Sequence, residues 1–217
     1  MTLQGGAAPK RWFFDAWSYV YDIALVQRAL YRPEQDAVIA ALRASTCRTV
    51  LDVGCGTGQL GHRLRAELPR TRVVGCDFSP GMLRQAAARD RTVGWVQGDA
   101  TRLPFHGGSF DAVVSTQAFH WFPDQVGALR EFARVLRPGG WLLLTVVSPP
   151  LAVLSRAIAV GSRLVGEPFY WPTTGDMRRM LAAAGLRLER QRRVFRLPGA
   201  VLLPPVLTVA RRRGRVS

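Results

Sequence analysis

The hydrophobic positions of this 217-residue chain form short apolar runs that alternate with stretches of helical periodicity. Apolar residues at i, i+3 and i+4 are typical of helices, and compact apolar runs of roughly four to eight residues are typical of buried strands. We predict strands at TVLDVG (49–54), RVVGCD (72–77), VGWVQ (93–97), FDAVVS (110–115) and GWLLLTVV (140–147). Helices are expected between them at 59–68, 81–89 and 124–136, the last stopped by Pro138-Gly139-Gly140.

The two ends of the chain depart from this alternation. Outside the alternating core we expect helices at 11–30, from Pro33, at 151–165 and at 175–184, and two β runs at 186–196 and 201–210. Strands that alternate with helices require a parallel sheet covered on both faces. The two final β runs have the pattern of an antiparallel hairpin that closes this sheet. The sequence therefore predicts an α/β, doubly wound, mostly parallel fold.

A glycine-rich loop follows the first predicted strand. Glycines at 54, 56 and 58 remove side chains that would keep a ligand off the backbone, and the helix N-terminus behind them favours polar ligand groups. Asp77 ends the second strand, where a carboxylate can accept hydrogen bonds from ribose hydroxyls. Asp99 follows the third strand. Each acid also has a structural interpretation, Asp77 as a helix cap and Asp99 in the turn before Thr101, but together they favour a nucleoside pocket.

The main alternative is an NAD-dependent oxidoreductase, because Gly56 to Gly61 satisfies the G-x-G-x-x-G fingerprint. That fingerprint leaves the earlier Gly54 unexplained. The single lysine, Lys10, lies near the N-terminus, so no Tyr-x-x-x-Lys proton relay is available. No second domain is available to hold a hydride acceptor either. These observations favour a methyl donor over a nicotinamide cofactor.

Four sequence blocks carry a family resemblance: VLDVGCGTG, VVGCDFSPGML, GDATRLPFHGGSFDAVVSTQAFHWF and RVLRPGGWLLL. In these blocks the chain resembles the small class I S-adenosylmethionine-dependent methyltransferases. It is most similar to the group that includes ubiquinone and menaquinone C-methyltransferases and trans-aconitate methyltransferases. The resemblance implies a Rossmann-like seven-stranded sheet with an antiparallel last strand, helical lid elements and S-adenosylmethionine as cofactor.

The resemblance also implies a role for each position of the site. Asp52 and the backbone of Gly54, Cys55, Gly56 and Gly58 are expected to hold the methionine portion of the cofactor. The remaining expected contacts are Asp77 at the ribose, Phe78 and Met82 beside the adenine, Asp99 and Ala100 at the adenine edge, Thr116 and Gln117 beside the sulfonium, and Tyr21 in a helix that closes over the cofactor. The alternative for Tyr21 is a half-buried packing tyrosine.

The acceptor is inferred from two apolar elements that can roof the pocket, the N-terminal helix and the insertion 148–173. They suit a small hydrophobic or aromatic molecule, for instance a lipid or a quinone-like compound. His120, just past the fourth strand, is the candidate general base, because a neutral imidazole suits that role near pH 7. Alternatively, His120 only lines the pocket and takes no part in proton transfer. Direct methyl displacement requires positioning, and a base is optional.

The net positive charge of the chain suggests two further hypotheses about its binding partners. The chain has 30 basic and 15 acidic residues, a formal net charge of +15, so nucleic-acid methylation is an alternative function. Against it, residues 115–118 lack the Asn/Asp-Pro-Pro-aromatic tetrapeptide of base-amine methyltransferases. The second hypothesis is peripheral contact with an anionic membrane through Arg156 and Arg163, which share one helix side opposite Leu154, Ile158 and Val165, and through Arg211, Arg212, Arg213 and Arg215. Its alternative is an inward-packed lid and a solvated basic tail.

We expect one cytoplasmic domain without a bound metal. Cysteines and histidines lack metal-ligand spacing, and the N-terminus has no apolar stretch long enough for a signal peptide. The divisions expected are a disordered tail at 1–10 and one methyltransferase domain at 11–217. Within that domain we place N-terminal cap helices at 11–46, the cofactor-binding core at 47–147, the helical lid insertion at 148–173, and a C-terminal helix and hairpin at 174–217.

Overall fold

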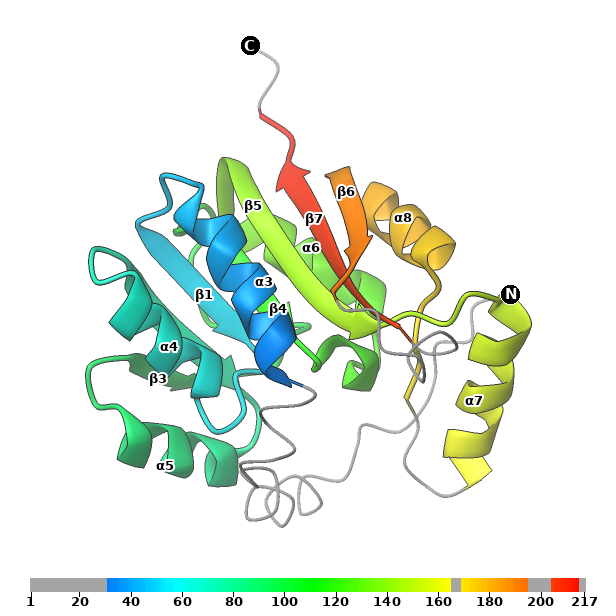
Figure 1. Cartoon of the computed structure of the whole chain (residues 1–217), viewed down its shortest axis with the longest axis horizontal. Coiled ribbons are helices and arrows are strands. Elements are labelled where there is room, and N and C mark those ends of the chain that lie inside the picture. Colours follow the sequence, from blue (N-terminus) through cyan, green and yellow to red (C-terminus); the bar gives the residue numbers. More distant parts are fainter. Residues whose placement is uncertain (1–30, 165–168, 195–203, 215–217) are drawn as a thin grey trace.

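The central feature of the molecule is one seven-stranded sheet with the order β3-β2-β1-β4-β5-β7-β6 (Figure 1). The computed structural model describes residues 31–164, 169–194 and 204–214. The strands are β1 (Thr49–Val53), β2 (Arg72–Asp77), β3 (Gly94–Gln97), β4 (Phe110–Thr116), β5 (Leu136–Val147), β6 (Leu186–Arg193) and β7 (Pro205–Arg212). The expected helix at 11–30, Tyr21 within it and the disordered tail at 1–10 lie outside the described residues.

Strand direction follows the sequence prediction. β1 pairs in parallel with β2 and β4, β3 with β2, and β5 with β4. β7 inserts antiparallel between β5 and β6. The predicted doubly wound sheet with an antiparallel last strand is therefore confirmed. Because chain order reverses at β1, the carboxyl ends of β1, β2 and β4 meet at one edge, where open α/β sheets bind ligands.

Helices cover both faces of the sheet, as an α/β fold requires (Figure 1). The helices are α3 (Arg32–Arg43), α4 (Gln59–Glu67), α5 (Pro80–Arg89), the 3₁₀ turn η2 (Phe119–Trp121), α6 (Gln125–Val135), α7 (Ala152–Leu164) and α8 (Thr174–Ala183). α3, α4 and α5 lie on one face, and α6 and α8 on the other. Neighbouring residues of one strand therefore enter different cores: Val50 packs with α3 and α4, whereas Leu51 packs with α6 and α8.

The largest difference from the predicted boundaries lies at the start of β5, and β7 (Pro205–Arg212) also ends two residues beyond the expected 210. Pro138-Gly139-Gly140 does not separate helix from strand, because α6 ends at Val135 and β5 begins at Leu136. Leu136 already pairs with Phe110, and residues 137–140 form an irregularity before pairing resumes at Trp141. Glycine at 140 permits this close approach, since a Cβ there would lie 3.0 Å from the carbonyl oxygen of Asp111.

α7 stands apart from both helical layers, beyond the end of β5 (Figure 1). Its buried face carries the small residues Ser155, Ala159 and Ser162, whereas Leu154 and Ile158, expected to form an apolar packing face, are only half-buried. Within the three described ranges, no helix has the length and apolarity needed to cross a bilayer. α7 is therefore a short surface helix attached through small side chains.

Candidate active site

The glycine loop between β1 and α4 is tied to the neighbouring strand end. Gly54 and Cys55 donate their backbone N–H groups to the carbonyl oxygen of Cys76, at 2.8 and 3.2 Å. Gly54, Gly56 and Gly58 all have positive φ, at 70°, 54° and 77°, a region that residues with a Cβ rarely occupy. The loop is thus a fixed left-handed turn at the carboxyl edge of the sheet.

The three glycines serve different needs. A Cβ on Gly54 would lie 2.3 Å from the Cβ of Ala118, and a Cβ on Gly58 would lie 2.6 Å from the ring of Trp95. Both positions are therefore glycine because protein atoms pack against them. At Gly56 the nearest contact is the Met82 sulfur at 4.0 Å. Of these three glycines, only Gly56 faces open space that a side chain would occupy. We therefore expect a ligand to approach the backbone at Gly56.

Asp77 joins the loop to the start of α5. One carboxylate oxygen accepts from the Gly56 N–H at 2.8 Å, and the other accepts from the Ser79 N–H at 2.9 Å. The N-cap of α5 is Ser79, whose hydroxyl accepts from the Met82 N–H at 3.1 Å. Asp77 is therefore not the helix cap that the alternative interpretation required. The expected ribose contact of Asp77 stays a prediction.

Asp52 is the most unusual acid of the site. It lies within β1 and is 1% exposed, and neither carboxyl oxygen has a hydrogen-bond partner among the described residues. Burial, together with the nearby charge of Asp77, raises its pKa to about 8. A buried carboxyl without a partner is costly. Its surroundings therefore fit a ligand that brings a hydrogen-bonding cation, such as the ammonium of a bound amino acid moiety.

The expected adenine contacts divide into exposed and buried groups. Asp99 is exposed, and one of its oxygens accepts from both the N–H and the hydroxyl of Thr101, each at 2.8 Å. This is the turn-stabilising role, and the adenine contact stays a prediction. Ala100 is 8% exposed and packs in the core, Met82 is 5% exposed, and Phe78 is half-buried. The contact of Phe78 with the adenine stays a prediction as well.

The end of β4 contains a polar contact that the sequence did not reveal. Gln117 has a φ of 51°, the one positive value at a non-glycine position in the described residues. Its N–H donates to the carbonyl oxygen of Thr145 at 2.9 Å, and its side-chain amide donates to Glu34 at 2.7 Å. Glu34 lies in the first turn of α3 and is 2% exposed, and burial raises its pKa to about 7. Neighbouring Thr116 is half-buried.

His120 lies in η2, three residues beyond Gln117. It is 8% exposed, and burial lowers its pKa to about 3. The imidazole is therefore neutral at pH 7, but the charged form that a general base must reach is disfavoured. Its Nδ1 has no partner among the residues described. The ring packs in an aromatic box whose members are His120, Trp121, Phe169 and Trp171, with ring centroids 5.1 to 5.9 Å apart in the contacting pairs.

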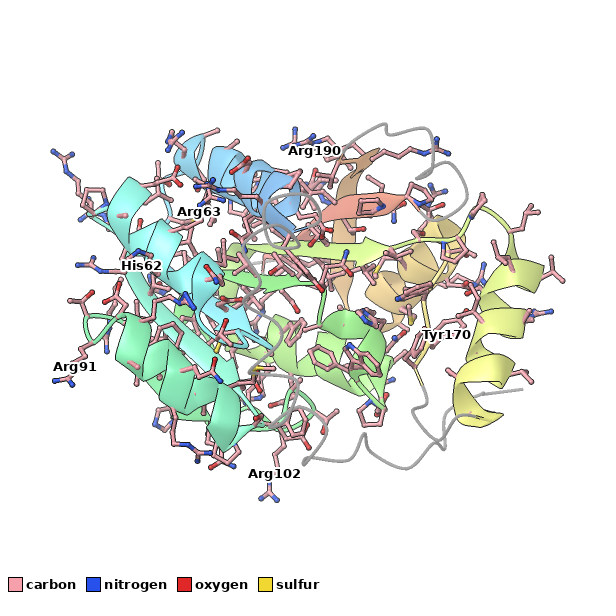
Figure 2. The ribbon with its side chains drawn as sticks, turned by 60° about the horizontal axis from the view of Figure 1, so that its bottom comes forward. His62, Arg63, Arg91, Arg102, Tyr170 and Arg190 are labelled. Carbon is pink, nitrogen blue, oxygen red and sulfur yellow. The ribbon has the colours of Figure 1, made fainter. Side chains whose placement is uncertain are left out.

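Residues 169–172, here called the strap, hold this box together. The Tyr170 N–H donates to the carbonyl oxygen of His120 at 3.0 Å, and the Gln125 amide donates to the carbonyl oxygens of Phe119 and Tyr170 at 3.1 and 2.8 Å. Figure 2 shows Tyr170 on the segment between α7 and the body of the molecule. On the α7 side, the hydroxyl of Ser155 donates to the carbonyl oxygen of Trp171. The strap therefore connects η2 to α7.

The basic C-terminus is partly structural. The Arg211 guanidinium lies over the Trp141 ring at 4.2 Å and donates to the carbonyl oxygen of Gly139 at 3.2 Å. Arg212 donates to the carbonyl oxygens of Arg134 and Leu136. Both belong to β7 and not to a solvated tail. Arg213 is exposed, and Arg215 lies outside the described residues.

Three residues that sequence reasoning missed support the site. The Trp95 ring fills the space above Gly58, Gly61 and Gly75. These glycines beside a tryptophan in the next strand are the sequence signal that could have indicated its role. Glu34 and Trp171 carried no local signal, because their partners are far away in the sequence. Among the described residues, no group of three or more His, Cys, Asp and Glu side chains lies together as a metal site.

Comparison with known proteins agrees with this geometry. Residues 51–144 match the family described as a methyltransferase domain. The chain is similar to the demethylmenaquinone methyltransferase of Deinococcus radiodurans, with 40% identity over 126 residues, covering 56% of this chain and 52% of the relative. It is also similar to the demethylmenaquinone methyltransferase of Mycobacterium sp. (strain KMS), with 35% identity over 204 residues, covering 82% and 86%.

These relatives are matched to different extents. The aligned part of this chain spans about half the length of the first curated relatives that it matches, and most of the mycobacterial one. Among solved structures, a SAM-dependent methyltransferase from Thermotoga maritima, described as a possible histamine N-methyltransferase, superposes with a TM-score of 0.73. Its sequence is 22% identical, and the match covers 94% of this chain and 100% of that one. At this identity the likeness supports the fold alone.

Proposed function

Because this chain belongs to the family of S-adenosylmethionine-dependent methyltransferases, we propose that it transfers the cofactor's methyl group to a small hydrophobic or aromatic acceptor. The observation that carries the cofactor part of the proposal is the buried, unpartnered carboxyl of Asp52, which lies in β1 just before the glycine loop. A nicotinamide cofactor offers no ammonium group to this carboxyl. The family assignment also removes the oxidoreductase alternative.

The residues of the glycine loop and the strand ends bind and orient the cofactor. Asp52 and the Gly56 backbone take its methionine portion, and Asp77 takes the ribose. When bound, S-adenosylmethionine would supply an activated methyl group: the acceptor would form a bond to the methyl carbon as the carbon–sulfur bond breaks, and S-adenosylhomocysteine would leave as a neutral thioether. Thr116 and Gln117 line the sulfonium side, where Glu34 fixes the Gln117 amide. In-line positioning of this kind can provide roughly 7–11 kcal/mol of a barrier, so the residues act mainly by placement.

The proposed acceptor side is walled by uncharged rings. The aromatic box offers only neutral rings to a substrate, and the family model's match ends at residue 144, before α7 and the strap. A neutral apolar or aromatic acceptor suits such walls better than a folded nucleic acid does. With its pKa lowered to about 3, His120 orients the acceptor and does not remove its proton. The acceptor's own acidity then decides whether transfer needs a base.

Calorimetry tests the cofactor assignment. We expect the purified protein to bind S-adenosylmethionine and S-adenosylhomocysteine and to give no heat with NADH. Replacement of Asp77 with Ala removes acceptors from both the ribose and the loop N–H groups, and cofactor affinity should fall by roughly 1–3 kcal/mol. Binding of NADH alone would overturn the proposal. An unchanged dissociation constant in D77A would remove Asp77 from the site.

We further propose that α7 touches an anionic membrane surface when the acceptor is a lipid or quinone-like molecule. Leu151, Val153 and Val160, at or on α7, are exposed by 61%, 69% and 59%. Arg156 and Arg163 are exposed on one flank of the same helix. An amphipathic surface helix with basic residues can bind anionic lipid reversibly, and each basic residue contributes about 1 kcal/mol.

Vesicle co-sedimentation at low salt tests the membrane contact. Pelleting with anionic vesicles and not with neutral ones should be reduced in the double variant R156Q/R163Q. The matched control is R91Q/R102Q, which removes the same number of positive charges at exposed residues that Figure 2 places away from α7. Equal loss in both variants would indicate a general charge effect. Failure of the wild type to pellet with either vesicle would leave α7 as a lid only.

A further inference from the structure

Two buried polar atoms without partners lie in the aromatic box. They are Nδ1 of His120 and Nε1 of Trp171, and no described residue donates to or accepts from either one. A buried donor or acceptor without a partner is unfavourable, so such groups in a native site call for an occupant. The two rings have centroids 5.9 Å apart. The two nitrogens thus belong to neighbouring rings of one cluster, so a single ligand group is the occupant to consider for both.

The two rings are held in place by backbone hydrogen bonds and by a third ring of the box. The backbone of His120 accepts from the Tyr170 N–H, and the backbone of Trp171 accepts from the hydroxyl of Ser155. Phe169 packs against both rings, at 5.9 Å from His120 and 5.1 Å from Trp171. The nitrogens therefore belong to rings fixed by neighbours on several sides. Fixed, unpartnered groups are preorganised for one kind of ligand atom.

The two nitrogens have complementary chemistry. The indole N–H can only donate. Because burial keeps the imidazole neutral, its Nδ1 can offer a lone pair. A hydroxyl group satisfies both, since it accepts from the indole and donates to the imidazole. An ether or carbonyl oxygen satisfies only the indole, and a hydrocarbon satisfies neither. A carboxylate or ammonium would bring a charge into a box of neutral rings.

We propose that His120 and Trp171 form a binding subsite for a hydroxyl group on the aromatic ring of the methyl acceptor. The proposal rests on the proposed methyltransferase function and names its acceptor class, a hydroxylated aromatic compound. Specificity follows from the unpartnered nitrogens, because an acceptor without the hydroxyl leaves them unsatisfied. An ordered water bound between the rings is the competing occupant.

Three matched probes separate these occupants: 2-naphthol, 2-methoxynaphthalene and naphthalene. Ligand-observed NMR gives their dissociation constants with S-adenosylhomocysteine present, so that no methyl transfer occurs. In the wild type we expect affinity to fall roughly five- to tenfold from naphthol to the methoxy compound, and by a similar factor from there to naphthalene, because one hydrogen bond is lost at each step.

Single replacements assign each step to one ring. Trp171→Phe should abolish the preference for the methoxy compound over naphthalene and keep the preference for naphthol over methoxy. His120→Phe should abolish the preference for naphthol over the methoxy compound and keep the preference for the methoxy compound over naphthalene. Trp121→Phe is the matched control inside the same box and should keep both preferences, since its Nε1 is not among the buried unpartnered atoms. The dissociation constant of S-adenosylhomocysteine verifies that each variant is folded.

The outcomes distinguish the two proposals. A wild type that fails to bind S-adenosylhomocysteine contradicts the proposed function. A wild type that binds it but holds the three probes equally, or binds no naphthol up to its solubility limit, contradicts the hydroxyl subsite alone. If both ligand preferences persist in W171F and in H120F, the two nitrogens are not their source. That result also overturns the subsite, because the nitrogens then bind water and not the probe.

Discussion

The cofactor end and the acceptor end of the site are built in opposite ways. The cofactor end comes from residues 52–58 and 77–79, and its parts are joined by backbone hydrogen bonds to carboxyl and carbonyl oxygens. The acceptor end joins η2 to a strap some 50 residues later, and its unpartnered atoms belong to neutral rings. In our proposal, one end is prepared for positive charge and the other for a neutral molecule. This difference suits a reaction that moves a methyl group away from a sulfonium.

The largest effect should come from the loop glycine that is packed against protein. In Gly54→Ala, a positive φ of 70° and a Cβ 2.3 Å from Ala118 act together. Strain and overpacking of this kind should lower the free energy of unfolding by about 4 kcal/mol. Gly56→Ala has open space, so its stability should fall by only about 1–2 kcal/mol, while cofactor binding is lost.

Urea denaturation and calorimetry on the same two variants check this contrast. The expected pattern is an unstable G54A protein and a folded G56A protein that no longer binds S-adenosylhomocysteine. Equal destabilisation of the two would mean that the glycines share one structural role. Retained cofactor binding in G56A would remove the space over Gly56 from the proposed site.

The second effect concerns Glu34, which lies at the junction of the two ends. The unfolded chain releases the Glu34 proton near its ordinary pKa of 4.5 and the folded chain near 7. Between these values the unfolded state binds fewer protons, so stability falls as pH rises from 4.5 to 7 and then levels off. The difference in stability between wild type and Glu34→Gln should therefore change by about 3 kcal/mol over this window in favour of the variant.

Chemical denaturation at several pH values measures this difference. Taking the difference between the two proteins cancels the contributions of Asp52 and His120, whose raised and lowered pKa values act in opposite directions. Gln still accepts from the Gln117 amide, so kcat near pH 6 should change little. If the free energies of unfolding of wild type and E34Q change in parallel with pH, Glu34 is not the buried acid that the contact with Gln117 indicates.

The third effect tests the charge preference of the cofactor end. The Asp52 carboxyl has a pKa of about 8 without ligand, and it must ionise to pair with an ammonium group. Cofactor binding near pH 7 should therefore release a proton, and affinity should rise with pH up to about 8. Asp52→Asn should lower affinity by about 2 kcal/mol and abolish the proton release.

Calorimetry in buffers of different ionisation enthalpy counts the protons. Asp99→Asn is the matched control, because Asp99 is exposed and engaged with Thr101, and its release should equal that of the wild type. Identical proton release in D52N and wild type would place the ammonium away from Asp52.

The cofactor end was more predictable than the acceptor end for a physical reason. Strand ends, glycines and acids such as Asp77 are set by local sequence, and the parallel alternation brings them to one edge of the sheet. The same rule gave all seven strands, although the start of β5 was misplaced because Leu136 pairs with Phe110 before the glycines. Alternation of apolar runs cannot foresee such an irregularity.

Contacts between distant segments left no sequence pattern. Glu34 meets Gln117 across 83 positions, and Trp171 meets His120 through the strap. The position of His120 after a strand end is visible in the sequence, but its environment is not, since the ring also contacts Phe169 and Trp171 from a distant segment. The sequence also could not tell that Gly54 and Gly58 serve packing while Gly56 faces open space.

The smallest effect should separate the two ends most cleanly. The hydroxyl of Ser162 accepts from the Phe169 N–H at 3.2 Å and has one proton to donate, with the carbonyl oxygen of Ala159 at 2.9 Å and that of Phe169 at 3.3 Å within reach. Ser162→Ala removes these bonds, with a net contribution of about 1 kcal/mol. Because the strap positions the aromatic box, 2-naphthol should bind roughly fivefold more weakly, while the S-adenosylhomocysteine dissociation constant stays unchanged. Ser109→Ala, which loses one surface bond to the carbonyl of His106, is the control and should affect neither ligand. If S162A weakens both ligands together, the strap and the glycine loop form one unit and the division into two ends is wrong.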